Sequence, residues 1–199
     1  MKIVAIGSIP LDFEVGCSNT LHNFSARGQS VNLIIPRDKN WNEKQMKSDE
    51  LNDRLGISSI YSVENFDYSE VTQLNVTLLN SVIEKIKPSV AIIPYVGNSN
   101  KMKKVLAKSA LLACRKVETI LMYETNKNSN FLPTIYHVVN KNINKKTSSA
   151  TKHKKIISSK SKSRKYDSLQ RIYANNLGIS NPVEAFESQR MILLQNDLF

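Results

Sequence analysis

The sequence has few of the residues that build metal centres and disulfide frameworks. Among its 199 residues are two cysteines and three histidines, namely Cys17, Cys114, His22, His137 and His153. Two cysteines exclude a disulfide-stapled scaffold, and no Cys-x-x-Cys pair is present to bind zinc. Residues 23–136 contain no histidine at all. This scarcity restricts every metal or acid–base site that the chain could form.

Long apolar runs are also absent. No run approaches the ~20 residues that a membrane-spanning helix requires, and residues 3–6 after Met1-Lys2 are too short an apolar stretch for a signal peptide. We therefore expect a cytoplasmic protein. With 41% hydrophobic residues and only 6 Gly and 6 Pro, the chain is neither fibrous nor disordered, and its length favours a single domain over residues 1–199.

Positive charge is concentrated in the second half of the chain. The net charge is +11 overall, and residues 1–100 carry nine Lys and Arg against eleven Asp and Glu. A basic second half is typical of proteins with an anionic partner. It is equally typical of a Lys- and Asn-rich proteome in which lysine fills surface positions by default.

Residues 140–165 are predicted to be a mobile basic loop. Residues 144–165 contain nine Lys and Arg and no acidic residue. The candidates for binding phosphate or another anion are Lys152, Lys154, Lys155, Lys160, Lys162, Arg164 and Lys165. No aromatic residue is interleaved among them, so the stacking platform expected for single-stranded nucleic acid is missing. Nucleic-acid binding is accordingly disfavoured relative to a solvated loop.

Short β-branched runs alternate with helical patterns along the chain. Strands are predicted at residues 3–6, 31–35, 60–63, 90–93, 119–123 and 134–139, and helices at 19–26, 43–55, 74–86, 101–116, 166–177 and 182–194. Strands that lack polar alternation are buried on both faces. The fold class is therefore α/β, a Rossmann-like, doubly wound, mostly parallel sheet with helices on both faces.

In such a sheet, ligands bind beyond the carboxyl ends of the strands, so the segment Gly7–Thr20 after the first strand is the first candidate site. It matches the pattern A-H-P-D-D-x-E-L-G-C-G-G-T at Pro10, Asp12, Glu14, Gly16, Cys17 and Thr20. This pattern resembles the signature of the LmbE-like/PIG-L family, zinc-dependent deacetylases of N-acetyl sugars. Later segments resemble the family in the same order, including Ala110–Arg115 and Val183–Glu187, which is similar to its closing A-E-A-F-E.

The resemblance also implies which residues would carry the chemistry. In the family, the first His and second Asp of H-P-D-D bind zinc with the last His of an H-x-D-H motif, and the first Asp is the general base. Here Ile9 and Lys103 stand at the two histidine positions, Leu11 stands at the base position, and Asp12 alone is retained. We therefore expect no catalytic residue, no metal and no cofactor.

Several polar residues remain as candidates to line a ligand-binding cleft. They are Asp12, Glu14, Gly16, Ser18, Asn19, Thr20, Asn98, Asn100 and Lys103. Each also has a structural interpretation, since Asp12 can accept backbone hydrogen bonds, Glu14 suits a helix dipole, and Ser18 and Thr20 are ordinary helix-start residues. His137 is expected to be a hydrogen-bonded histidine in a strand near the sheet interior.

These observations give a leading hypothesis and two alternatives. The leading hypothesis is a non-catalytic binding or partner subunit in sugar-conjugate metabolism, whose partner is a sugar conjugate or an active enzyme, and which forms a homo-oligomer. The first alternative is an active zinc-dependent N-acetylglucosaminyl-type deacetylase with an atypical ligand set, such as Asp12 with His137. The second alternative is phosphate or nucleic-acid binding by the basic second half.

Overall fold

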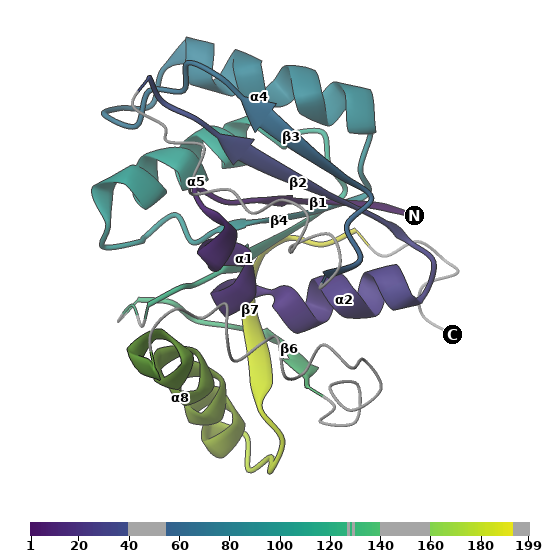
Figure 1. Ribbon diagram of the computed structural model, residues 1–199, viewed down its shortest axis with the longest axis vertical. Helices are drawn as coiled ribbons and strands as arrows, with labels where there is room; N and C mark the ends of the chain where they lie inside the picture. Colours follow the sequence, from purple (N-terminus) through teal and green to yellow (C-terminus); the bar gives the residue numbers. More distant parts are fainter. Residues whose placement is uncertain (40–54, 127, 129, 140–159, 193–199) are drawn as a thin grey trace.

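The described strands form one seven-stranded sheet in the order β3-β2-β1-β4-β5-β7-β6 (Figure 1). The computed structural model describes residues 1–39, 55–126, 128, 130–139 and 160–192, with the backbone alone for 160–167. The strands are β1 (Lys2–Ile6), β2 (Ser30–Pro36), β3 (Ser59–Val63), β4 (Val90–Pro94), β5 (Thr119–Tyr123), β6 (Ile135–Val138) and β7 (Val183–Arg190). The first five are parallel, whereas β7 is antiparallel to both β5 and β6.

The helices begin and end where local chemistry dictates. They are α1 (Pro10–Gly16), α2 (Ser18–Ala26), α4 (Gln73–Ile86), α5 (Lys101–Ala113) and α8 (Lys160–Asn176). The Thr72 side chain accepts the N–H of Asn75 at the start of α4, and Lys87 ends that helix with a left-handed φ of 53°. Such side-chain caps satisfy amides that have no partner inside the helix. None of the described helices is long and apolar enough to cross a membrane.

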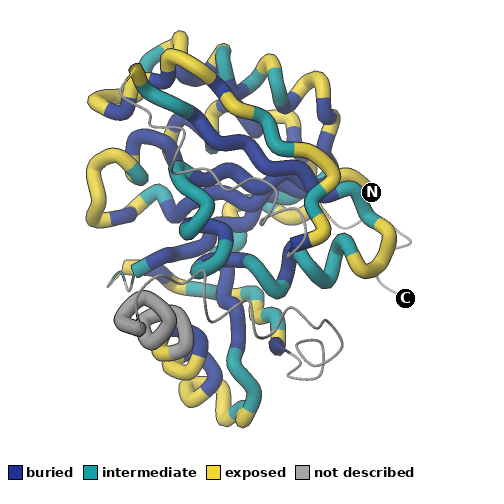
Figure 2. The backbone as a smooth tube through the Cα atoms, viewed as in Figure 1, coloured by how far each residue is buried: buried dark blue, intermediate teal, exposed yellow. Residues whose placement is uncertain are grey.

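Helices cover both faces of the sheet, and successive strand residues divide between them. Val4 and Ile6 of β1 pack in one core with residues of α4, α5 and α8, whereas Ile3 and Ala5 pack in a second core with α1 and α2. Figure 2 shows the central strands buried along their length. Burial on both faces explains why the strands have no polar alternation. The α/β class and the mostly parallel sheet are thus confirmed.

The predicted helix over residues 182–194 is wrong. Residues 183–190 form β7, which lies between β5 and β6 and pairs Phe186 with both Tyr123 and Ile135. An antiparallel strand at this place needs no crossover helix. The charged Glu184 among apolar residues made the sequence of this segment resemble an amphipathic helix. In the structure Glu184 is buried.

Other boundaries also differ from those predicted. The short helix α1 was not anticipated, α5 ends at Ala113 rather than residue 116, and α8 begins at Lys160. The last residues of the predicted basic loop, 160–165, are therefore helical. The predicted helix over 43–55 lies almost wholly outside the described residues.

Candidate functional site

A buried carboxylate lies at the start of α1, directly after β1. Asp12 is 2% exposed, and its Oδ2 accepts hydrogen bonds from the Ser8 N–H (2.9 Å), the Ser8 hydroxyl (2.6 Å) and the Ile9 N–H (3.3 Å). Ile9 is extended and Pro10 occupies the first turn, where its missing N–H is not needed. Negative charge is favoured at a helix N-terminus. The local sequence thus fixes one carboxylate at the carboxyl end of β1.

An ammonium group meets this carboxylate from the first turn of α5. Lys103 Nζ lies 2.6 Å from Asp12 Oδ1 and donates a second hydrogen bond to Thr125 Oγ1 (2.7 Å). The Lys103 side chain is 16% exposed, so the ion pair is largely withdrawn from water. Because β1, β4 and β5 are neighbours in the sheet, the loops at their carboxyl ends bring these three side chains together.

These residues do not fit a zinc ion. The resemblance assigns the metal ligands to the positions of Ile9, Asp12 and Lys103. An isoleucine side chain has no donor atom, an ammonium group has no lone pair, and the one carboxylate already contacts a cation. Among the described residues, no three His, Cys, Asp or Glu side chains are grouped so that they could hold a metal. The cation at this carboxylate is supplied by the protein itself.

A second buried carboxylate, Glu184 on β7, gathers three of the predicted cleft residues. Its oxygens accept the N–H groups of Asn19 and Thr20 (both 2.8 Å) and the Thr20 hydroxyl (2.6 Å). Asn19 Nδ2 (2.9 Å) and Ser18 Oγ (3.4 Å) also donate to it. Burial by itself would raise the pKa of this carboxyl, but the nearby His137 ring and the hydrogen bonds from Thr20 and Asn19 outweigh burial and lower the pKa. Ser18, Asn19 and Thr20, at the start of α2, therefore anchor that helix to β7.

His137 belongs to the same hydrogen-bond network. Its Nδ1 lies 3.0 Å from Thr20 Oγ1 and its Nε2 lies 2.9 Å from Asn23 Nδ2. The carboxylate beside it is Glu184, at 3.9 Å. The hydrogen bonds agree with the expectation, but β6 is an edge strand rather than an interior one. Since both ring nitrogens have protein partners, His137 offers no free nitrogen for a metal shared with Asp12.

Gly16 has a packing role. A Cβ atom added there would lie 2.1 Å from the ring of Tyr123, so only glycine lets α1 pass this close to β5. The Tyr123 hydroxyl donates to the Ile6 carbonyl (2.9 Å). Burial, with the charge of Asp12, raises the pKa of that phenol. Glu14 is half-buried on the same helix.

The remaining candidates lie in the loop between β4 and α5. Asn98 Oδ1 accepts the Asn100 N–H (2.9 Å), and Asn100 Oδ1 caps α5 by accepting the Lys103 N–H (3.2 Å). Asn98 is 2% exposed. Of the predicted anion-binding residues, Lys152, Lys154 and Lys155 lie outside the described residues, and the other four lie in the part of α8 whose side chains are not described.

Sequence reasoning missed Ser8, Thr125 and Glu124. Ser8 and Thr125 each follow a strand end, which was the available signal. Buried Glu124 accepts both the N–H and the Nδ2 of Asn128 (2.9 Å each) as well as the Tyr173 hydroxyl. It thereby holds the loop that carries Thr125.

No protein-family model matches the sequence, and no curated protein matches it. Solved structures do match. TT1542, a conserved protein from Thermus thermophilus, has a TM-score of 0.77 at 19% identity over 96% of each chain. The N,N'-diacetylchitobiose deacetylase from Pyrococcus horikoshii has a TM-score of 0.70 at 14% identity, covering 100% of this chain and 88% of the other. This chain has the LmbE/PIG-L deacetylase fold.

The deacetylase fold also supports other chemistry. The 4-carboxy-2-hydroxymuconate hydratase GalB from Pseudomonas putida matches with a TM-score of 0.70 at 12% identity, over 98% of both chains. One fold therefore includes a hydratase as well as deacetylases. Function must then be argued from the residues of the site rather than from the fold.

Proposed function

We propose that this protein is a non-catalytic relative of the deacetylases, acting as a binding or partner subunit in sugar-conjugate metabolism. The ion pair between Lys103 and Asp12 carries the proposal, because an internal ammonium takes the place of the metal. The two groups lie 2.6 Å apart and are nearly buried. The partner would be a sugar conjugate or an active enzyme, consistent with the diacetylchitobiose deacetylase among the structural matches.

The chemistry of deacetylation explains why this substitution matters. A catalytic zinc ion lowers the pKa of a bound water to about 7 and polarises the carbonyl under attack. A lysine ammonium has no vacant coordination position to bind and ionise water. A general base would also be needed to take the proton, and the position that the resemblance assigns to it is Leu11.

Metal analysis with a parallel activity assay tests this proposal. Protein purified from zinc-supplemented culture is expected to contain far less than one equivalent of zinc. It should not release acetate from N-acetylglucosamine conjugates above the buffer rate. The Pyrococcus horikoshii deacetylase, assayed alongside, is the positive control. Stoichiometric zinc, or turnover that a chelator abolishes, would overturn the proposal and favour an active deacetylase.

A further inference from the structure

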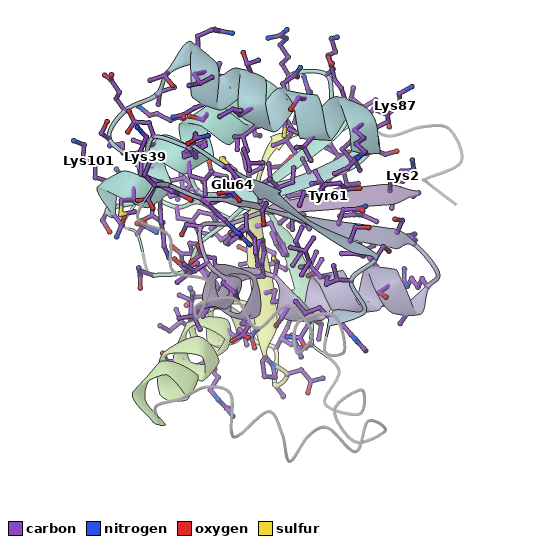
Figure 3. All side chains as sticks on the ribbon, turned by 45° about the horizontal axis from the view of Figure 1, so that its top comes forward. Lys2, Lys39, Tyr61, Glu64, Lys87 and Lys101 are labelled. Carbon is purple, nitrogen blue, oxygen red and sulfur yellow. The ribbon has the colours of Figure 1, made fainter. Side chains whose placement is uncertain are left out.

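The first turn of α5 carries an unusual arrangement of charge. Lys101, Lys103 and Lys104 lie in it, and no acidic residue does. Cations near a helix N-terminus are disfavoured, because the amide N–H groups there already carry partial positive charge. A local conflict of this kind is expected where function requires it. In Figure 3, Lys101 lies at the edge of the sheet where the parallel strands end, whereas Lys2 and Lys87 lie at the other edge, where the strands begin.

A buried donor without a partner lies at the same place. The Asn98 carboxamide contacts the start of α5, since its Oδ1 accepts the Asn100 N–H. Its Nδ2 is buried and has no hydrogen-bond partner in the part of the chain that the structure describes. A buried donor that is left without an acceptor destabilises the folded protein. An acceptor from outside the protein would remove this cost.

Lys103 has a third N–H in addition to the two that are used. An ammonium group has three donors, and Asp12 and Thr125 accept from it. The carboxylates nearby are already engaged. Asp12 accepts hydrogen bonds from four donor groups. Hydrogen bonds from Ser69, with a smaller effect of Lys101, lower the pKa of Asp67. Asp12 offsets the charge of Lys103 and Asp67 partly offsets that of Lys101, so the positive charge that remains here comes from Lys104 and the helix terminus.

We propose that the start of α5 is a binding site for a phosphate-type oxyanion. Lys103 and Asn98 donate to it directly, while Lys101 and Lys104 supply charge at the rim. The site combines a helix N-terminus with flexible ammonium groups, which together suit a tetrahedral anion with several acceptor oxygens. The inference rests on the proposed function, because Lys103 holds this position only if no metal does. A free phosphate ion and a phosphorylated sugar present the same chemistry.

Titration calorimetry with inorganic phosphate, at constant ionic strength set by chloride, tests the site. We expect saturable binding to one site in the millimolar range or tighter. Glucose 6-phosphate distinguishes the two sources, since tighter binding of it would identify a sugar phosphate and equal binding would identify phosphate alone. No binding of either probe beyond the chloride effect would overturn the proposal.

Two variants at the site and one control locate the binding. Asn98→Asp keeps the acceptor for the Asn100 N–H and adds a negative charge that a helix N-terminus tolerates, yet it repels an anion. We expect it to weaken phosphate binding about tenfold or more, the effect of losing roughly one charge-assisted hydrogen bond. The double variant Lys101→Gln/Lys104→Gln should weaken binding by a similar factor, because it removes two positive charges from the rim. Lys108→Gln, an exposed lysine later in α5, should change binding less than about twofold because charge effects weaken with distance. An equal loss in all three proteins would mean diffuse attraction and no site.

The zinc content of the same preparation separates the two proposals. Zinc-free protein that binds phosphate supports both. Zinc-free protein that binds no phosphate overturns only the anion site. Stoichiometric zinc overturns the proposed function, and phosphate binding that then disappears with a chelator overturns the lysine site as well.

Discussion

At the scale of single residues, the ion pair at the candidate site should dominate the response to mutation. Lys103→Met keeps most of the side-chain volume but leaves the Asp12 carboxylate buried without its cation. We expect a loss of about 3–5 kcal/mol in the free energy of unfolding, which is typical of a broken buried pair. Urea denaturation at pH 7 measures it. Lys116→Met is a matched control, because its partner Glu84 is 3.4 Å away and both side chains are more than half exposed, so it should cost less than about 1 kcal/mol.

The double variant Asp12→Asn/Lys103→Met completes a thermodynamic cycle with the two single variants. It removes both charges, and the carboxamide that replaces the carboxylate can still accept the Ser8 N–H. Neutral replacement of a buried pair is often close to neutral in stability, so the double variant should recover most of the loss caused by Lys103→Met. Simple additivity of the two single losses would show that the charges do not interact.

Sequence reasoning placed Asp12 and Lys103 in the same candidate cleft, but it gave no role to the second buried carboxylate, Glu184. Asp12 follows β1 and Lys103 follows β4, and the carboxyl ends of parallel strands lie at one edge of the sheet. Ser18, Asn19 and Thr20 were predicted to face a ligand but bond to Glu184, which is more than 160 positions away. A contact between residues so far apart in the sequence depends on the order of the strands in the sheet, which local sequence patterns do not specify.

At the scale of secondary-structure elements, Glu184 joins α2 to β7 in a pH-dependent way. The pKa of its carboxyl is lowered in the folded protein. The ionised form is thus favoured by folding, and its contribution to stability is present above the unfolded-state pKa of about 4.3. This contribution should decrease as the pH falls below that value toward the folded pKa.

Glu184→Gln tests this contribution. The variant places an amide N–H₂ against the Thr20 donors, so it should cost about 1–3 kcal/mol at pH 7. The difference from the wild type should shrink as the pH falls below the unfolded-state pKa of about 4.3, since the wild-type carboxyl also becomes protonated. Urea denaturation as the pH is lowered through this value provides the measurement. The exposed Glu118→Gln serves as a control with little effect, and a difference that stays constant with pH would contradict the assignment to Glu184.

The same element shows why strand β7 was mistaken for a helix. Residues 183–186 are all buried, since β7 lies inside the sheet with helices on its faces. A charged residue in a fully buried run resembles the polar face of a helix when only spacing is considered. The parallel strands β1, β2 and β4 avoided this ambiguity because each is a largely β-branched apolar run bounded by glycine or proline. Strands of uniformly apolar composition were therefore predicted, whereas β7, in which tertiary contacts satisfy the charge of Glu184, was not.

At the scale of the whole molecule, the sheet matches that of the deacetylase fold, whereas residues at the edge of the sheet differ from the family's sequence pattern. The two cores and the strand order depend on apolar side chains spread over most of the described chain. By resemblance, the metal site and its general base depend on only four positions, those of Ile9, Leu11, Asp12 and Lys103, close to the carboxyl ends of β1 and β4. Residues other than the family's at three of these positions, Ile9, Leu11 and Lys103, therefore leave the fold unaffected. This separation predicts that the reverse exchange can restore metal binding without redesign of the scaffold.

The triple variant Ile9→His/Leu11→Asp/Lys103→His tests that separation. It should bind about one equivalent of zinc, and zinc at 100 times Kd should add about 2.7 kcal/mol to the stability. For a domain of this size, that gain corresponds to a rise in Tm of roughly 5–10 °C, measured by calorimetry with and without a chelator. The double variant Ile9→His/Leu11→Asp keeps Lys103 and should show no zinc-dependent shift, because the ammonium still contacts Asp12. Zinc binding by the double variant would show that the lysine does not exclude the metal, and the central argument for a non-catalytic protein would then fail.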